Sequence, residues 1–119
     1  MVGRVWHGWT SRENADAYER LLLDTVLPGI AARGIAGYHG AWLYRRDVPE
    51  GVEFVTTMLF ESMARVREFA GADHETAVVP PAARALLARF DATSAHYDVR
   101  LAPGGAAGGV PGERTSTTS

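Results

Sequence analysis

The chain contains no cysteine and no lysine, and these two absences remove several kinds of chemistry at once. Without cysteine there is no disulfide, no thiolate nucleophile and no thiolate metal site. Without lysine there is no Schiff-base chemistry and no covalent attachment of pyridoxal phosphate. Glutamine is also missing, and Asn14 is the single asparagine. Polar chemistry must therefore come from histidine, tyrosine, tryptophan, arginine, serine, threonine and the carboxylates.

Long apolar runs and a strong charge imbalance are missing as well. No apolar run approaches the roughly 20 residues that a membrane-spanning helix needs, and we expect no membrane association. The first residues lack the basic and then apolar pattern of a signal peptide. The 119 residues carry a formal net charge of −2, so we do not expect a nucleic acid as partner. With 46% hydrophobic residues, the composition favours one cytoplasmic globular domain.

The first strand is predicted from a regular alternation at residues 2–9. A period of two with branched and aromatic side chains is typical of a β-strand. Arg4 and Trp6 point to one face of this segment, whereas His7 and Trp9 point to the other. Because both faces carry large side chains, we expect this strand to be covered on both sides.

The rest of the chain alternates between helical and extended patterns. Thr10 and Glu13 form a capping-box pattern before a helix whose apolar face continues until Pro28 and Gly29 stop or kink it. Ser62 is a second N-cap, and Gly71 ends the helix that it starts. The other predicted elements are strands at residues 36–46, 52–60 and 93–101 and two short helices at residues 73–79 and 82–90.

This order of elements predicts an α+β protein with the ferredoxin-like βαββαβ fold, in which both helices cover one face of an antiparallel sheet. The fourth strand then lies beside the first, and the third lies between the first and the second. Residues 1–101 form the domain, and residues 102–119 are expected to be a disordered tail rich in Gly, Pro, Ser and Thr. The uncovered sheet face still carries large apolar side chains. We therefore expect a homodimer whose sheets pack face to face.

Two histidines are the first candidates for catalysis. His7 lies near the end of the first strand and His96 near the start of the last, so they are cross-strand neighbours if their faces match. Histidine titrates near neutrality, and such a pair suits general acid–base catalysis. One alternative is two buried histidines hydrogen-bonded to the backbone or to Tyr97. Another is a metal site whose third ligand is Asp98 or Glu53.

Four short segments occur in a recognisable order: RVWHG at residues 4–8, LYRR at 43–46, REFAG at 67–71 and HYDV at 96–99. Over residues 2–101 the chain thereby resembles the antibiotic biosynthesis monooxygenase-like proteins of the dimeric α/β-barrel superfamily. The resemblance implies a ferredoxin-like monomer, a dimeric α/β barrel and a pocket between sheet and helices. Better-known relatives oxidise polycyclic aromatic polyketides with dioxygen and neither metal nor flavin. Others cleave haem, and some superfamily members are polyketide cyclases.

The chain departs from the catalytic patterns of these relatives. The oxygen-using members place an asparagine and a tryptophan in the pocket, whereas Asn14 lies near the exposed start of a helix. Phe60 and Phe69 occupy the region of the third strand and second helix. The Asn, Trp and His set of the haem-cleaving members is not reproduced either. What remains of the family pattern is His7 and His96.

Three hypotheses follow for the function. The first is a cofactor-independent monooxygenase of secondary metabolism that acts on an aromatic or polycyclic substrate, with His7 or His96 as the acid/base group. The second is a non-redox cyclase, isomerase or dehydratase that uses the same histidines, and the third is a non-catalytic dimer that binds a small ligand. We expect no cofactor and no metal. The aromatic residues expected to contact the substrate, with core and dimer contacts as the alternative role for most of them, are Trp9, Tyr18, Trp42, Phe69 and Tyr97.

Overall fold

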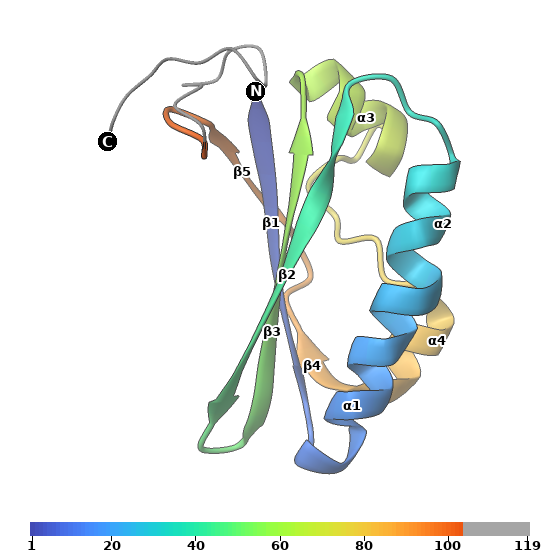
Figure 1. Cartoon of the computed structure of the whole chain (residues 1–119), viewed down its shortest axis with the longest axis vertical. Coiled ribbons are helices and arrows are strands. Elements are labelled where there is room, and N and C mark those ends of the chain that lie inside the picture. The colour runs from blue at the N-terminus through green and yellow to red at the C-terminus, as the bar shows by residue number, and fades with distance from the viewer. Residues whose placement is uncertain (104–119) are drawn as a thin grey trace.

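A computed structural model describes residues 1–103 as one antiparallel sheet with helices on one of its faces (Figure 1). The elements are β1 (Val2–Thr10), α1 (Arg12–Leu21), η1 (Leu22–Val26), α2 (Leu27–Ala32), β2 (Tyr38–Val48), β3 (Gly51–Phe60), α3 (Met63–Ala70), α4 (Pro81–Leu86), β4 (Leu87–Phe90) and β5 (Ala95–Asp98). The expected tail at 102–119 falls almost wholly outside the described residues. No helix within residues 1–103 combines the length and apolar character needed to cross a membrane.

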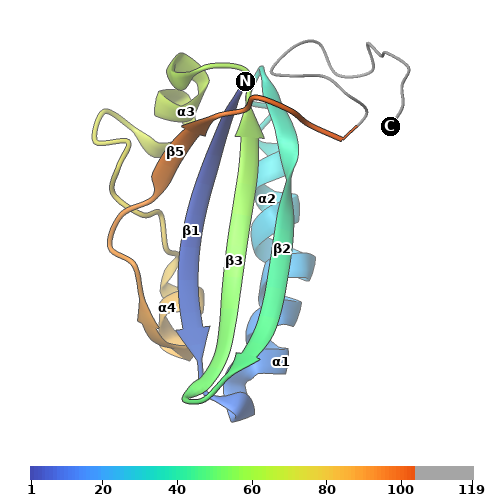
Figure 2. The same ribbon diagram turned by 90° about the vertical axis from the view of Figure 1, so that its left-hand side faces the viewer.

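The strand order confirms the predicted ferredoxin-like arrangement. The sheet runs β2-β3-β1-β4, and β5 also pairs with β1. Figure 2 shows the strands in front of α1 and α2, so one sheet face is covered by helices and the other is open. We call these the helix face and the open face. The side chains of β1 alternate between them, as the sequence pattern predicted.

The last strand differs from its prediction in position and continuity. The expected helix at residues 82–90 ends at Leu86, and residues 87–90 form β4 against the end of β1. The free edge of β1 explains this, because its backbone groups need partners and β4 and β5 supply them at its two ends. β4 pairs with the segment from Gly8 to Thr10, and β5 pairs with the segment from Val2 to Val5.

The segment of residues 73–80 is an irregular connection and not the short helix that its composition predicted. Its backbone is hydrogen-bonded to the chain between β4 and β5. Ala77 N–H donates to the carbonyl of Ala92 (2.9 Å), and Ser94 N–H donates to the carbonyl of Glu75 (2.8 Å). These groups are therefore not free to form the i to i+4 bonds of a helix.

The first helical region is longer than predicted and changes its winding in the middle. Ser11, not Thr10, is the N-cap, and its hydroxyl accepts a hydrogen bond from Asn14 N–H. After α1 the chain forms a π-helical segment, η1, in which Leu27 N–H donates to the carbonyl of Leu22. Pro28 then stands in the first turn of α2, where proline is tolerated because no N–H is required there. The change of winding thus lets the helical path pass a proline that was expected to end or kink it.

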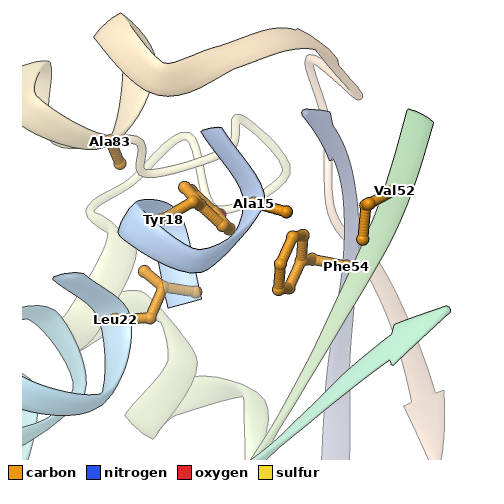
Figure 3. Close-up of a cluster of buried hydrophobic side chains, with 6 residues drawn as sticks. All are labelled: Ala15, Tyr18, Leu22, Val52, Phe54 and Ala83. Carbon is orange, nitrogen blue, oxygen red and sulfur yellow. The ribbon is translucent and has the colours of Figure 1, made fainter. Parts of the chain in front are cut away.

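The core consists of two clusters at opposite ends of the helix face. One joins α1, η1, β3 and α4, and Figure 3 shows Tyr18 beside Phe54 in it, with ring centroids 4.8 Å apart. The other joins β1, β3 and α3 around Phe60 and Val66, which are fully buried. The space between the two clusters is less completely filled.

Alanine substitutions at two glycines test the backbone geometry of the β2–β3 hairpin and of α2. A Cβ at Gly51, which has a φ of +155°, lies 2.2 Å from the carbonyl oxygen of Thr10, whereas a Cβ at Gly29 in α2 meets nothing within 4 Å. We expect Gly51→Ala to lower the free energy of unfolding by about 2 kcal/mol or more. We expect Gly29→Ala to raise it by about 0.5–1 kcal/mol. Urea denaturation of both variants measures this, and equal effects contradict the hairpin geometry.

Candidate functional site: a cavity with a buried arginine

A cavity of about 60 Å³ lies between the two core clusters on the helix face. One water needs roughly 10–15 Å³ on this scale, so the space suits a single small ring and not a polycycle. Tyr18, Leu22 and Ala83 from the first cluster and Met58 and Phe69 from the second contribute to its wall. The full lining is Arg4, Trp6, Tyr18, Leu22, Val26, Leu27, Ile30, Thr56, Met58, Phe69, Val78, Val79, Pro80, Ala83 and Ser94.

The π-helical segment forms much of the apolar wall. Leu22 and Val26 from η1 and Leu27 and Ile30 from α2 all line the cavity. Winding with i to i+5 hydrogen bonds is rare and occurs often at functional sites, because it displaces side chains from the regular helical stripe. The displaced stripe coincides here with the position of the cavity.

Arg4 is the charged residue of the cavity wall, and it is 3% exposed. Its Nη1 donates to the carbonyl of His74 and to Nε2 of His96 (3.0 Å), and its Nη2 donates to the carbonyl of Thr76 (3.1 Å). Its guanidinium also lies 5.5 Å from the centre of the Phe69 ring. Within residues 1–103 no carboxylate forms an ion pair with Arg4.

The histidines beside Arg4 add no negative charge. Burial lowers the pKa of His96, and the positive charge of Arg4 and the neighbouring His74 lower it further. His96 is therefore neutral at pH 7, which fits an Nε2 that accepts a hydrogen bond from Arg4. The His74 and His96 rings lie 5.5 Å apart, and Nδ1 of His74 is buried without a hydrogen-bond partner in the described part of the chain. Burial also lowers the pKa of Arg4.

Three hydroxyl groups complete the polar lining. Tyr18, Thr56 and Ser94 all border the cavity, and none of their hydroxyls forms a hydrogen bond with another group of residues 1–103. Tyr18 and Ser94 are buried, and burial raises the pKa of the Tyr18 phenol, which therefore stays protonated. The oxygens of these three hydroxyls are not among the fully buried side-chain atoms without a partner, so they border the cavity space and are available to a ligand or to water.

The two histidines of the sequence hypothesis do not form a pair. The register of β1 and β5 places His96 opposite Arg4, and His7 points to the other face of the sheet. His7 contacts Glu53 instead, with Nδ1 2.8 Å from Oε2. The condition that their faces match is therefore not met, and one acid/base site cannot contain both.

A polar cluster surrounds His7 on the open face. Glu53 is 5% exposed, and it also accepts a hydrogen bond from Nε of Arg46. The hydrogen bonds from His7 and Arg46 lower the pKa of Glu53. The His7 ring stacks on Trp9 with centroids 6.0 Å apart, and Arg89 lies 3.6 Å over the Trp9 ring.

The aromatic residues expected to contact a substrate divide between the two faces. Tyr18 and Phe69 line the cavity, whereas Trp9, Trp42 and Tyr97 belong to the open face, where Trp42 and Tyr97 are exposed.

The sequence analysis missed Arg4, Thr56 and Ser94 as lining residues. The sequence did contain a signal for Arg4. The first strand was expected to be covered on both faces, and an arginine in such a strand must be buried. No group of three potential metal ligands occurs within residues 1–103, Asp98 and Glu53 included.

Comparison with known proteins found solved structures of moderate similarity, of which two are described here. No family model and no curated protein sequence matches the chain. Rv0793 from Mycobacterium tuberculosis is 24% identical, with 82% of this chain and 91% of that chain covered and a TM-score of 0.46. A monooxygenase from the gene ActVA-Orf6 of Streptomyces coelicolor, solved in complex with Nanaomycin D, is 17% identical, with coverages of 81% and 83% and a TM-score of 0.47. The fold assignment above rests on the strand order of this chain.

The cluster on the open face leads to a pH prediction. Because the pKa of Glu53 is lowered from its ordinary value of 4.5 in the folded state, its contribution to stability is complete above that pH and is lost as the pH falls further. Glu53→Gln should be less stable than the wild type at pH 7, and the difference should shrink toward pH 3. Thermal unfolding from pH 3 to pH 7 measures this. Glu61→Gln, at an exposed carboxylate, serves as the control, and an unchanged difference at all pH values contradicts the assignment.

Proposed function

We propose that this protein is a small enzyme that oxidises a hydroxyaromatic substrate with dioxygen, without a cofactor, in the cavity of the helix face. The observation that carries the proposal is a largely apolar cavity with aromatic walls from Trp6, Tyr18 and Phe69, in which three hydroxyls have no partner within residues 1–103. Concave apolar sites with a few polar groups are the usual form of a small-molecule site. The resemblance of the sequence to antibiotic biosynthesis monooxygenase-like proteins supports the same reaction class.

The chemistry requires an electron-rich carbon and a site that excludes bulk water. Ionisation of a ring hydroxyl places charge on the ring, and the carbon that carries it reacts with dioxygen. For a phenol with a ring hydrogen opposite its hydroxyl, the overall change is C₆H₆O + O₂ → C₆H₄O₂ + H₂O, so one oxygen atom enters the substrate and the other leaves as water. In this proposal the Tyr18 hydroxyl donates a hydrogen bond to the ionised substrate oxygen, because preorganised donors stabilise developing negative charge.

The geometry changes the role that we assign to the histidines. His96 lies behind Arg4 and does not line the cavity, so in this proposal it positions Arg4 and is not the base. His7 belongs to the open face and takes no part in the reaction. The substrate hydroxyl loses its proton to solvent before the substrate enters the cavity. The size of the cavity favours a substrate with one ring over the polycyclic substrate that the family resemblance implied.

Oxygen consumption tests the reaction. We expect the wild type to consume oxygen with a member of a panel of mono- and dihydroxybenzenes and hydroxylated cyclohexadienones, and to give no product anaerobically. Tyr18→Phe should reduce the rate about 10- to 100-fold through loss of one hydrogen-bond donor. Tyr38→Phe is the matched control, because Tyr38 is half-buried but does not line the cavity.

Three outcomes of this experiment separate the alternatives. Turnover at the same rate without oxygen identifies a non-redox enzyme. Binding of panel members without turnover identifies a ligand-binding protein. An equal loss in Tyr18→Phe and Tyr38→Phe contradicts the assignment of the cavity as the site.

We also propose that two copies of the chain pair through their open faces. Trp42, Tyr44 and Tyr97 are 39%, 54% and 60% exposed there, and an exposed apolar face of this kind favours an interface. Sedimentation equilibrium should give about twice the chain mass of 12.8 kDa for the wild type. Trp42→Glu should weaken the dimer because it buries an unpaired charge. Leu23→Glu is the control, since Leu23 is 50% exposed on η1. A monomeric wild type contradicts the proposal.

A further inference from the structure

Arg4 carries a buried charge for which the described chain supplies no counter-charge. Its three acceptors are two backbone carbonyls and a neutral imidazole nitrogen. A guanidinium cannot neutralise itself by losing its proton in a protein, so its burial is costly unless an anion accompanies it. The other cation near this part of the wall is Arg33, whose guanidinium lies 5.2 Å from the centre of the Phe69 ring.

The remaining donors of Arg4 have the geometry of a carboxylate site. A guanidinium has five N–H donors, and the three hydrogen bonds use the Nη1 pair and one donor of Nη2. This leaves Nε–H and one Nη2–H, on adjacent nitrogens, with no acceptor within residues 1–103. Two such parallel donors match the two oxygens of a carboxylate. Arg4 lines the cavity, and the hydroxyls of Ser94 and Thr56 in the same wall add further donors.

We infer that the cavity takes an aromatic carboxylic acid, with its ring against the wall of Tyr18, Phe69 and η1 and its carboxylate on Arg4. This inference rests on the part of the proposed function that makes the cavity a ligand site, and it is independent of the reaction. Arg4 recognises the substrate, and the positions of the reacting atoms are set from the carboxylate end. The ligand class narrows from hydroxyaromatic molecules in general to hydroxyaromatic acids.

A purely structural role for Arg4 makes a different prediction. Its bonds to the carbonyls of His74 and Thr76 hold the connection at residues 73–80 against β1. If Arg4 only holds this connection in place, the cavity should bind a ligand with a carboxylate and a ligand with a neutral group of the same shape equally well. A test that varies the ligand on the wild-type protein therefore separates the two roles without depending on whether an Arg4 variant folds.

The experiment titrates the full chain with benzoate, benzamide and benzyl alcohol and follows indole N–H signals by NMR. Trp6 lines the cavity, and its Nε1 donates to the carbonyl of Asp91, whereas Trp9 and Trp42 lie on the open face and are internal controls. We expect benzoate to shift the Trp6 signal and to bind at least about 10-fold more tightly than benzamide, as a charge-assisted bidentate pair requires. The signals of Trp9 and Trp42 should stay unchanged.

Two arginine variants test whether the preference for benzoate over benzamide depends on Arg4. Arg4→Gln should reduce the affinity for benzoate at least about 10-fold and leave that for benzamide within about twofold. Arg33→Gln is the matched control, because Arg33 also lies over Phe69 but does not line the cavity, and it should keep the preference. Folding of both variants is checked by circular dichroism, and the wild-type ligand comparison stands if Arg4→Gln does not fold.

Three results overturn the inference: equal binding of benzoate and benzamide, a preference that survives in a folded Arg4→Gln, and no shift of Trp6 with any of the three ligands. The experiments distinguish failure of the proposed reaction from failure of the proposed carboxylate site. If benzoate binds through Arg4 and hydroxybenzoates consume no oxygen, the oxygenase proposal fails and the carboxylate site stands. If phenols without a carboxylate are oxidised and benzoate does not bind, the reaction stands and the carboxylate site fails.

Discussion

The register of β1 in the centre of the sheet determines the chemistry of both faces. β1 is hydrogen-bonded to β3 on one side and to β4 and β5 on the other, so its side chains have no freedom to change faces. The register sends Arg4 and Trp6 to the helix face and His7 and Trp9 to the open face. A shift by one residue exchanges the two sets, because the side-chain period of a strand is two. The cavity with its arginine and the open face with its Glu53 cluster are two consequences of the same pairing.

The second constraint is the cost of placing Arg4 between two apolar clusters. Removing a charge from water costs several kcal/mol even after relaxation, and carbonyl groups offset this only in part. The structure meets the cost by bringing the connection at residues 73–80 back across β1. The carbonyls of His74 and Thr76 and the ring of His96 then face the guanidinium. These backbone groups are in place because residues 75 and 77 are themselves bonded to residues 92 and 94. The irregular connection at residues 73–80 is therefore held in place by the residues between β4 and β5. Those residues in turn have partners because the connection crosses β1 at this point.

The sequence predicted the fold because periodicity and capping are local. Alternation over residues 2–9, the Ser62 cap and the Gly71 stop were sufficient for the element order, and the element order was sufficient for the sheet order. It could not predict the register, which depends on which residues of β1 and β5 meet, and so the relation of His7 to His96 stayed open. It also failed where tertiary hydrogen bonds outweigh local preference, at Leu87–Phe90 and at residues 73–79. The helical path continues past Pro28 because η1 changes the hydrogen bonding before it, which the local sequence does not indicate.

The charges of the two faces are balanced in different ways. On the open face the buried carboxylate of Glu53 is matched by His7 and Arg46, so the local charge is satisfied by the chain itself and the surrounding aromatic surface is free to pack. On the helix face the buried charge of Arg4 has only neutral partners among residues 1–103, and the hydroxyls of the cavity beside it have no acceptor in that part of the chain. A face whose polar groups are already paired is suited to contact with another protein, because nothing in it needs a specific ligand. A cavity whose polar groups are incompletely paired is suited to a ligand that supplies what is missing. The asymmetry between Glu53 and Arg4 is therefore the strongest physical reason to look for small-molecule chemistry on the helix face and for assembly on the open one.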